Sequence, residues 1–276
     1  MIEISDLQFS YGPKTVLKNI SLKASEGNIY GLLGENGVGK TTLLTLLCGL
    51  KKPQQGSITV DGRNPFDREP SLLSDQFYLA DEVTPVHAKA MSFAKEHGVF
   101  WPGFDLDKFF TILSELEVSA DQRMDAMSAG QLKKTWIAFA LACNAKYYYM
   151  DEPTNGLDIP SKSTFRKLMA SAADDSRLVL ISTHQVRDLH SLIDMVAILD
   201  NGHMLLNAST YEITQKLLFD VDDSRTTEGT VFYTEETPRG NYQVKENVNG
   251  LDSNLDLELL FNAAMMKKNE IANLFK

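Results

Sequence analysis

Apolar residues along this chain follow two different periods, and the two patterns alternate. Short apolar or alternating runs predict β-strands, and these lie at residues 2–9, 20–24, 29–33, 56–62, 77–79, 147–150, 178–182, 195–199 and 203–206. Longer stretches with apolar residues at three- and four-residue spacing predict helices, at residues 42–48, 86–96, 106–116, 130–143 and from Pro160 onward. Strands that alternate with helices favour an α/β fold, with a mainly parallel sheet core and helices on both faces.

The same pattern divides the chain into regions. The first strands are separated by turns at Gly12-Pro13 and Glu26-Gly27, and we expect them to form an antiparallel β subdomain. A helical insertion is expected at about residues 84–145. Beyond about residue 208 the sequence changes character: residues 230–234 and 242–246 predict a hairpin, and residues 255–275 a broken amphipathic helix. We therefore expect a main domain over residues 1–208 and a small α+β accessory extension over residues 209–276.

The composition narrows the class of protein. The chain has 276 residues, of which 43% are hydrophobic and 23% charged, as is ordinary for a soluble globular protein. Its net charge of −10 argues against a nucleic-acid partner, because such a partner calls for a basic face. No apolar run reaches the ~20 residues of a membrane helix, and the N-terminus lacks the pattern of a secretory signal. We expect Cys48 and Cys143 to be buried free thiols in the cytosol.

One segment carries the chemistry of phosphate binding. It consists of Gly34, Glu35, Asn36, Gly37, Val38, Gly39, Lys40, Thr41 and Thr42. These residues match the phosphate-loop pattern G-x-x-x-x-G-K-[ST], and they lie between a predicted strand and a predicted helix, as that pattern requires. Glycines let backbone N–H groups approach a phosphate closely. Lys40 is expected to reach the β- and γ-phosphates, and the Thr41 hydroxyl to ligate Mg²⁺.

The strand predicted at residues 147–150 ends in two acids, Asp151 and Glu152. The carboxyl ends of parallel strands meet at one edge of a sheet, beside the phosphate loop. In a P-loop enzyme the first acid holds Mg²⁺, and the second is placed to polarise the attacking water. Taken alone, this feature is equally typical of an ordinary strand that ends in solvated acids.

The segment Met127-Ser128-Ala129-Gly130-Gln131, just ahead of a predicted helix, is similar to the Leu-Ser-Gly-Gly-Gln sequence of the ATPase subunits of ABC transporters. The chain resembles this family over about residues 1–208, with several motifs in the same order. The resemblance implies that this element, which includes Gln131, binds nucleotide. Its residues Ser128 and Gly130 are expected to contact the γ-phosphate held by the opposite subunit. Met127 and Ala129 depart from the usual Leu and Gly, but both changes are small, and we expect function to survive them.

The resemblance assigns four further residues. Asp158, which ends the segment Asn155-Gly156-Leu157-Asp158, is expected to bridge to the partner's phosphate loop. His184 follows the strand predicted at residues 178–182, and it is expected to sense the γ-phosphate and position the attacking water. Tyr11 is expected to stack on adenine, with Val16 beneath the ribose.

One family feature is replaced in this chain. Members usually carry a Gln after the strand equivalent to residues 77–79, where it contacts Mg²⁺ and the attacking water and links to the membrane subunit. Here that position falls on Asp81, with Glu82 as the near alternative. A carboxylate can ligate Mg²⁺, but it also adds negative charge near the γ-phosphate. We expect Asp81 to serve as the Mg²⁺ and coupling contact.

Together these features predict an ATPase that uses Mg²⁺ and drives a separate transmembrane permease from the inner face of the membrane. Lys40, Glu152 and His184 are expected to carry catalysis. The resemblance implies a head-to-tail dimer with a second copy or a homologous subunit, holding two composite ATP sites. Residues 100–105 and the C-terminal tail are more similar to exporter-type bacterial subunits than to importers. The alternative is a soluble ABC ATPase that acts in iron–sulfur assembly or on nucleic acid.

Overall fold

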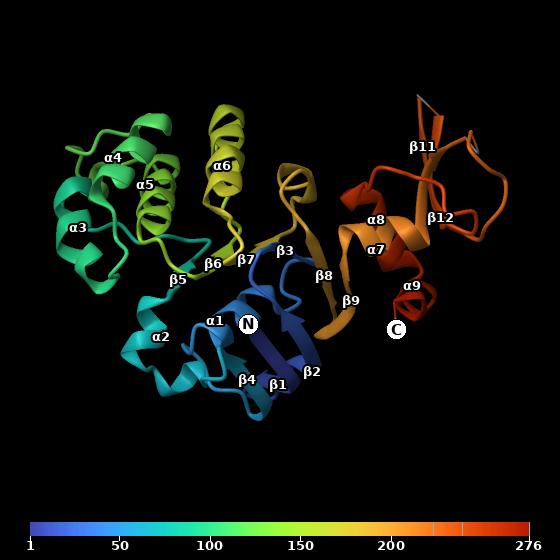
Figure 1. Ribbon diagram of the computed structural model, residues 1–276, viewed down its shortest axis with the longest axis horizontal. Helices are drawn as coiled ribbons and strands as arrows, with labels where there is room; N and C mark the ends of the chain where they lie inside the picture. Colours follow the sequence, from blue (N-terminus) through green and yellow to red (C-terminus); the bar gives the residue numbers. More distant parts are fainter. Residues whose placement is uncertain (223, 239, 276) are drawn as a thin grey trace.

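The computed structural model describes residues 1–222, 224–238 and 240–275. Its centre is a six-stranded sheet in the order β5-β6-β7-β3-β8-β9 (Figure 1). The first five strands in this order run parallel, and β9 pairs antiparallel with β8. These strands are β3 (Asn28–Leu33), β5 (Gln76–Leu79), β6 (Tyr147–Asp151), β7 (Leu178–Thr183), β8 (Met195–Asp200) and β9 (His203–Ser209). The mainly parallel core expected from the sequence is confirmed.

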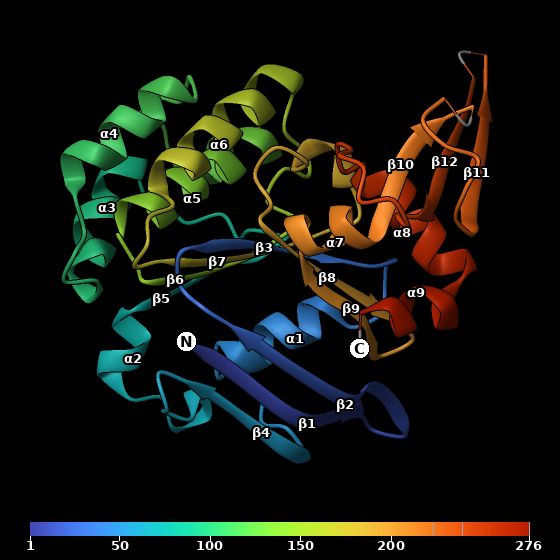
Figure 2. The ribbon, with the colours of Figure 1, turned by 45° about the vertical axis from the view of Figure 1, so that its right-hand side comes forward.

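A second sheet and one helix cover one face of this core. The sheet is antiparallel, in the order β2-β1-β4, and Figure 2 shows α1 between it and the central sheet. The elements are β1 (Ile2–Tyr11), β2 (Lys14–Ala24), α1 (Lys40–Leu47) and β4 (Gln55–Val60). Because alternate residues of a strand point to opposite faces, Tyr147 and Tyr149 of β6 pack with this layer, whereas Tyr148 and Met150 pack on the other side.

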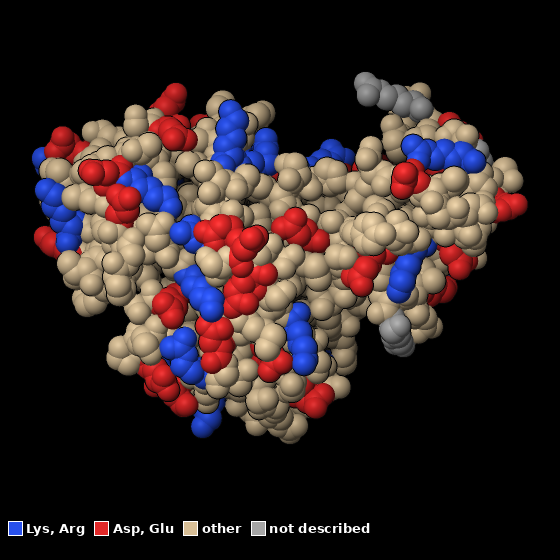
Figure 3. Space-filling model, in the orientation of Figure 1, with Lys and Arg blue, Asp and Glu red and all other residues tan. Residues whose placement is uncertain are grey.

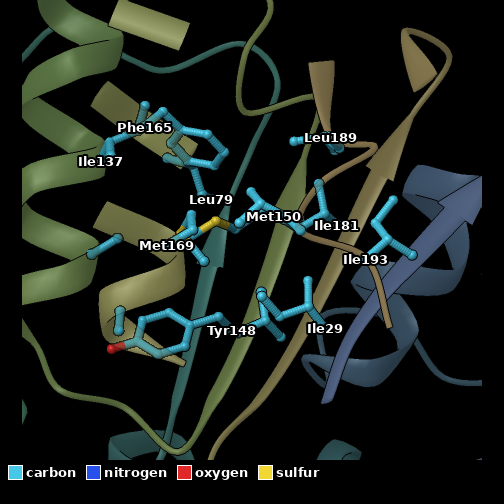
Figure 4. Close-up of a cluster of buried hydrophobic side chains, with 14 of the residues drawn as sticks. Ile29, Leu79, Ile137, Tyr148, Met150, Phe165, Met169, Ile181, Leu189 and Ile193 are labelled. Carbon is cyan, nitrogen blue, oxygen red and sulfur yellow. The ribbon is translucent and has the colours of Figure 1, made fainter. Parts of the chain in front are cut away.

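Helices cover the opposite face. Figure 4 shows Phe165 and Met169 of α6 beside Met150 of the central sheet, and all three side chains are fully buried. The helices of this layer and of the helical insertion are α3 (Ala90–His97), η2 (Gly98–Phe100), α4 (Leu106–Glu115), η3 (Met124–Ala126), α5 (Ala129–Ala142) and α6 (Ile159–Ala172). The helix expected from residue 86 begins only at Ala90, because Lys89 forms an isolated β-bridge with Arg123.

Two short helices that the sequence pattern did not predict connect β4 to β5. They are η1 (Pro65–Asp67) and α2 (Pro70–Ser74). Each begins with a proline, which is favoured in the first helical turn because its missing N–H has no partner there. The five residues of α2 are too few to display a helical period.

The C-terminal part lies beside β9 (Figure 1), and its buried apolar residues belong to the same core cluster as those on one face of the central sheet. It contains a three-stranded antiparallel sheet in the order β10-β12-β11. Helices α7 and α8 contact this sheet, and α9 contacts α8 and β9. The elements are α7 (Thr210–Lys216), β10 (Leu217–Val221), β11 (Val231–Thr237), β12 (Gly240–Glu246), α8 (Leu257–Met266) and α9 (Lys268–Leu274). The expected hairpin is therefore β11–β12, whose Arg239 lies outside the described residues, and the expected broken helix is α8 and α9.

Ion pairs lie within this C-terminal part and between it and the core. Lys245 and Asp220, each with a side chain 1% exposed, pair at 3.3 Å inside it. Lys268 of α9 pairs with Asp200 of β8 at 2.6 Å. The turn η4 (Val186–Asp188), which follows β7, also contacts α8, and Arg187 pairs there with Glu258. The extension thus reaches the segment that directly follows His184.

The surface is polar and mixed in charge. On the face drawn in Figure 3, acidic and basic side chains are interspersed, and acidic side chains gather near its centre. Among the described residues, no helix combines the length and the apolar character that crossing a membrane would need.

Candidate nucleotide-binding and hydrolysis site

The phosphate loop connects β3 to α1, and its glycines are required by its geometry. Gly39 caps α1 with φ of 117°, a conformation that L side chains rarely adopt. A Cβ on Gly34 would lie 2.6 Å from the carbonyl oxygen of Leu199, so only glycine fits beside β8. The first turn of α1 contains no acidic residue. Its backbone N–H groups therefore offer a site for an anion.

Lys40 lies folded back over this loop. Its Nζ donates to the carbonyl oxygens of Gly34 at 2.7 Å and Glu35 at 3.2 Å, and its side chain is 6% exposed. Burial lowers the pKa of Lys40, while the charges of Glu152 and Asp151 raise it. The ammonium is thus held at the mouth of the loop, where it can exchange carbonyl partners for phosphate oxygens.

Asp151 ends β6 next to the loop, and both of its carboxylate oxygens accept hydroxyl donors. Thr41 donates to one at 2.6 Å, and Ser182 of β7 donates to the other. The Asp151 side chain is buried. A hydroxyl and a carboxylate oxygen side by side form the kind of hard oxygen set that Mg²⁺ prefers. Thr41 and Asp151 therefore fit the expected metal role.

Glu152 is held in an unusual backbone conformation at the end of the same strand. Its φ is 43°, in the left-handed region, and it is buried. One carboxylate oxygen accepts from the backbone N–H of His184 at 2.9 Å and lies 2.8 Å from Nδ1 of that residue. The other accepts from the Thr183 hydroxyl at 3.1 Å. Backbone strain of this kind persists where surrounding contacts enforce it, and it is common at functional sites.

Lys40, Thr41, Asp151 and Glu152 open onto one cavity of about 300 Å³. His184 is outside its lining and faces a second cavity of about 250 Å³, which Gly34, Glu35 and Asn36 also line. Most of the phosphate loop lines the first cavity, together with Tyr11, Lys14, Val16, Asp81, Asp151 and Glu152. The Tyr11 hydroxyl lies 3.4 Å from the Thr42 hydroxyl, and 46% of the Tyr11 residue is exposed. A ring with an open face at the cavity rim suits the stacking of a planar base.

Asp81, at the position of the missing glutamine, lies in the cavity lining, whereas Glu82 does not. Its Oδ1 accepts from the Asn155 amide at 3.0 Å. Its backbone carbonyl accepts from Nζ of Lys133, a residue of α5, at 2.8 Å. Of the two acids considered from the sequence, the structure brings Asp81 beside Asp151 and Glu152.

Ser128, Gly130, Gln131 and Asp158 are outside the cavity lining. Ser128 and Gln131 form a reciprocal capping box at the start of α5, so Gln131 has a structural role there. A Cβ on Gly130 would lie 3.2 Å from the Gly156 carbonyl oxygen, which places the segment 155–158 directly beside the start of α5. Within one chain these residues therefore lie close to one another but away from the phosphate loop.

Sequence reasoning missed several of the contacts around the acids. Ser182 and Thr183 hold Asp151 and Glu152, and both could have been found as hydroxyl residues at the carboxyl end of a predicted parallel strand. The contact of Lys133 with residues 80 and 81 could not have been predicted, because a lysine within a helix usually points to solvent. In the structure Lys133 is only 3% exposed.

Comparisons with known proteins agree with this geometry. A family model described as "ABC transporter" matches residues 17–155. The chain is 31% identical over 213 residues to the SkfA peptide export ATP-binding protein SkfE of Bacillus subtilis, covering 74% of this chain and 87% of the relative. It is 30% identical to the cobalt import ATP-binding protein CbiO of Salmonella typhi, covering 77% and 82%. A solved ATP-binding subunit of an ABC transporter shares the fold, with a TM-score of 0.70, 23% identity, and coverage of 77% and 91%.

Proposed function

The chain belongs to the ABC transporter family, and we propose that two copies of it, head to tail, enclose two ATP molecules in composite sites. Family membership makes it an ATP-binding and ATP-hydrolysing subunit that works with a transmembrane partner. What remains to be assigned is which residues do this work, how the copies are arranged, and which way the substrate moves.

The proposal rests on the distance between the phosphate loop and the residues expected to contact the γ-phosphate of the opposite subunit. Lys40, Thr41 and Asp151 surround the cavity, whereas Ser128 and Asp158 lie on a different, exposed part of the surface. The start of α5 offers backbone N–H groups that suit a phosphate, yet the chain's own cavity does not include them. A second copy, turned head to tail, supplies this helix end to the γ-phosphate and so completes the site.

Each group in the cavity, and His184 beside Glu152, then has a role. Tyr11 stacks on adenine with Val16 beneath the ribose, and Lys40 binds the β- and γ-phosphate oxygens. Thr41 and Asp151 hold Mg²⁺, which neutralises charge on the phosphates when it is bound. Glu152 accepts a proton from the attacking water, and His184 orients that water against the γ-phosphate. Closing the dimer brings the last donors to the phosphate, so the isolated chain should hydrolyse ATP poorly.

The substitution Glu152→Gln tests this assignment. It removes the proton acceptor but keeps the size of the side chain and one acceptor oxygen for the His184 backbone N–H, so ATP should bind and turnover should fall by about 100-fold or more. With hydrolysis stopped, ATP should hold the two copies together, and the protein should elute as a dimer from a sizing column. The matched control is Glu82→Gln, an exposed acid outside the cavity lining. Turnover of Glu152→Gln at the wild-type rate would remove Glu152 from the mechanism.

We also propose that the transmembrane partner docks in an apolar groove beside β5. The groove has a volume of about 520 Å³ and is flanked by Leu50 and Phe100, which are 54% and 68% exposed. Gln76 lines it, and within the described residues the buried amide of Gln76 has no hydrogen-bond partner. A short helix of the partner would cover the apolar rim of this groove. Because β5 leads directly to Asp81, docking here connects the partner to the nucleotide cavity.

Phe100→Ser tests this groove. The soluble protein should keep its basal ATPase rate, but it should no longer remain with membranes that contain the co-expressed membrane protein of the neighbouring gene. Val99→Ser is the control, because Val99 is 73% exposed yet outside the groove lining. Retention of Phe100→Ser on those membranes would exclude the groove as the docking site.

For direction and location, we propose export from the inner face of the membrane. The relative SkfE is described as a peptide export protein, and CbiO as a cobalt import protein, so the relatives alone leave both directions possible. Residues 100–105 and the C-terminal part favour an exporter-type subunit. Reconstitution with the membrane partner, ATP being added on one side only, tests both points. Substrate that leaves the ATP side supports export, and substrate that enters the ATP side contradicts it.

A further inference from the structure

A buried lysine lies behind the acid that replaces the family's glutamine. Nζ of Lys133, on α5, donates to the carbonyl oxygens of Ala80 at 2.9 Å and Asp81 at 2.8 Å. The same nitrogen lies 4.0 Å from the Asp81 carboxylate. The Lys133 side chain is 3% exposed, whereas that of Asp81 is 40% exposed. The lysine therefore anchors the segment from inside while the carboxylate faces the cavity.

Burying an ammonium group is costly unless its donors are satisfied and its charge is compensated. Lys133 has three donors, and two of them meet the carbonyls of Ala80 and Asp81. The Asp81 carboxylate lies 4.0 Å away, close enough to compensate the charge but beyond hydrogen-bond distance. Burial lowers the pKa of Lys133, while the charges of Asp81, Asp151 and Glu152 raise it. The Lys133 ammonium thus lies beside Asp81, one of the acids that line the nucleotide cavity.

A carboxylate at position 81 creates a problem that a neutral glutamine does not. It faces the cavity that also holds Asp151 and Glu152, and a fourth negative group, the γ-phosphate, must enter. A positive charge within 4.0 Å offsets this repulsion. The Asn155 amide, which donates to the same carboxylate at 3.0 Å, fixes its direction.

We propose that Lys133 is a positioning residue for Asp81, and that the two work as a neutral pair in place of the family's glutamine. The inference rests on the proposed function, because it gives Asp81 a place in the ATP site. It goes beyond that function by adding a residue of α5, the helix that Ser128 caps. The pair therefore connects two sites: the start of α5, which is proposed to contact the ATP of the opposite copy, and the wall of the chain's own cavity.

The test is a double-mutant cycle measured by steady-state ATPase kinetics at saturating Mg²⁺. Lys133→Met keeps the length of the side chain but removes its charge, so the uncompensated Asp81 should raise the KM for ATP by roughly tenfold. Lys133→Met combined with Asp81→Asn removes both charges and should return KM to within about threefold of wild type. Lys89→Met, at an exposed lysine that pairs with Asp121, is the control and should leave KM unchanged.

A purely structural role for Lys133 predicts a different result. Its bonds to the two backbone carbonyls are lost in the single and double variants alike, so in that case the double variant would be as impaired as the single one, which overturns the proposal. If Lys133→Met does not fold, the double variant decides: folding with near-normal KM supports charge pairing, and failure to fold contradicts it. Wild-type protein that hydrolyses no ATP would instead refute the proposed function.

Discussion

Nδ1 of His184 lies 2.8 Å from Oε1 of Glu152, and the backbone N–H of His184 donates to the same oxygen. Lys40 Nζ is 3.8 Å from it. A single carboxylate oxygen thus connects the end of β6, the end of β7 and the phosphate loop. In the proposed mechanism Lys40 turns from the carbonyl oxygens of Gly34 and Glu35 to the phosphates, while the Glu152 carboxylate stays beside His184.

His184→Ala should lower kcat by about 100-fold and change KM little. In the proposed mechanism the histidine acts mainly on the attacking water in the transition state, so its contact with the γ-phosphate should add little to the binding of ATP. Steady-state ATPase kinetics measure both constants. His203→Ala is the control, because that histidine is exposed in β9 and lines neither the nucleotide cavity nor the neighbouring cavity that His184 lines. Turnover within twofold of wild type would show that His184 takes no part in the chemistry.

Tyr11→Ala should raise the KM for ATP by about tenfold and leave kcat nearly unchanged, since stacking on a base contributes ~1–3 kcal/mol. Tyr11→Phe keeps the ring and loses only the hydroxyl contact with Thr42 at 3.4 Å. Its KM should stay close to that of wild type. An unchanged KM in the alanine variant would mean that the base lies elsewhere.

Asp81→Ala should raise the Mg²⁺ concentration needed for half-maximal ATPase activity by about tenfold, as is typical when a supporting group of a metal site is removed. A titration of Mg²⁺ at fixed ATP measures this. Glu82→Ala should behave as wild type, because Glu82 is exposed and outside the cavity lining. If Asp81→Ala leaves both the Mg²⁺ dependence and the turnover unchanged, Asp81 does not replace the glutamine.

Stability should depend on pH through Glu26. Burial tends to raise the pKa of Glu26, but hydrogen bonds from the Met1 amino group and the Tyr147 hydroxyl lower it from 4.5 to about 2. A lowered acid pKa stabilises the fold above the unfolded value, and this stabilisation is lost as pH falls from about 4.5 toward 2. Urea unfolding at several pH values should give a higher free energy of unfolding for wild type than for Glu26→Gln, and this difference should disappear as the pH falls over this range. A difference that does not change with pH would contradict the assignment.

The sequence predicted best those features that depend on local residue patterns. The apolar runs at residues 147–150 and 178–182 predicted the buried parallel strands, and the glycines predicted the phosphate loop, where Gly39 has a φ of 117°. These features are local, so their pattern is visible in a single sequence.

The contacts that were missed are long-range. Lys133 looks like a solvent-exposed helix residue, and only the folded chain brings it to Asp81, more than fifty positions earlier. Ser128 and Gln131 were predicted only as nucleotide-binding residues, whereas in the structure they also form a capping box at the start of α5. That motif is local, and the Ser-x-x-Gln spacing could have predicted it, whereas the position of Lys133 depends on tertiary neighbours that no periodicity reveals.

The head-to-tail arrangement is tested most directly by a cross-link between the two halves of a composite site. Asn36→Cys in one preparation and Ser128→Cys in another, both carrying Glu152→Gln, are mixed with and without MgATP and oxidised. The native Cys48 and Cys143 are buried free thiols and should not react. The account predicts a disulfide between Cys at 36 and Cys at 128 of different chains only when MgATP is present. Links that form only between like positions, or to the same extent without ATP, would contradict it.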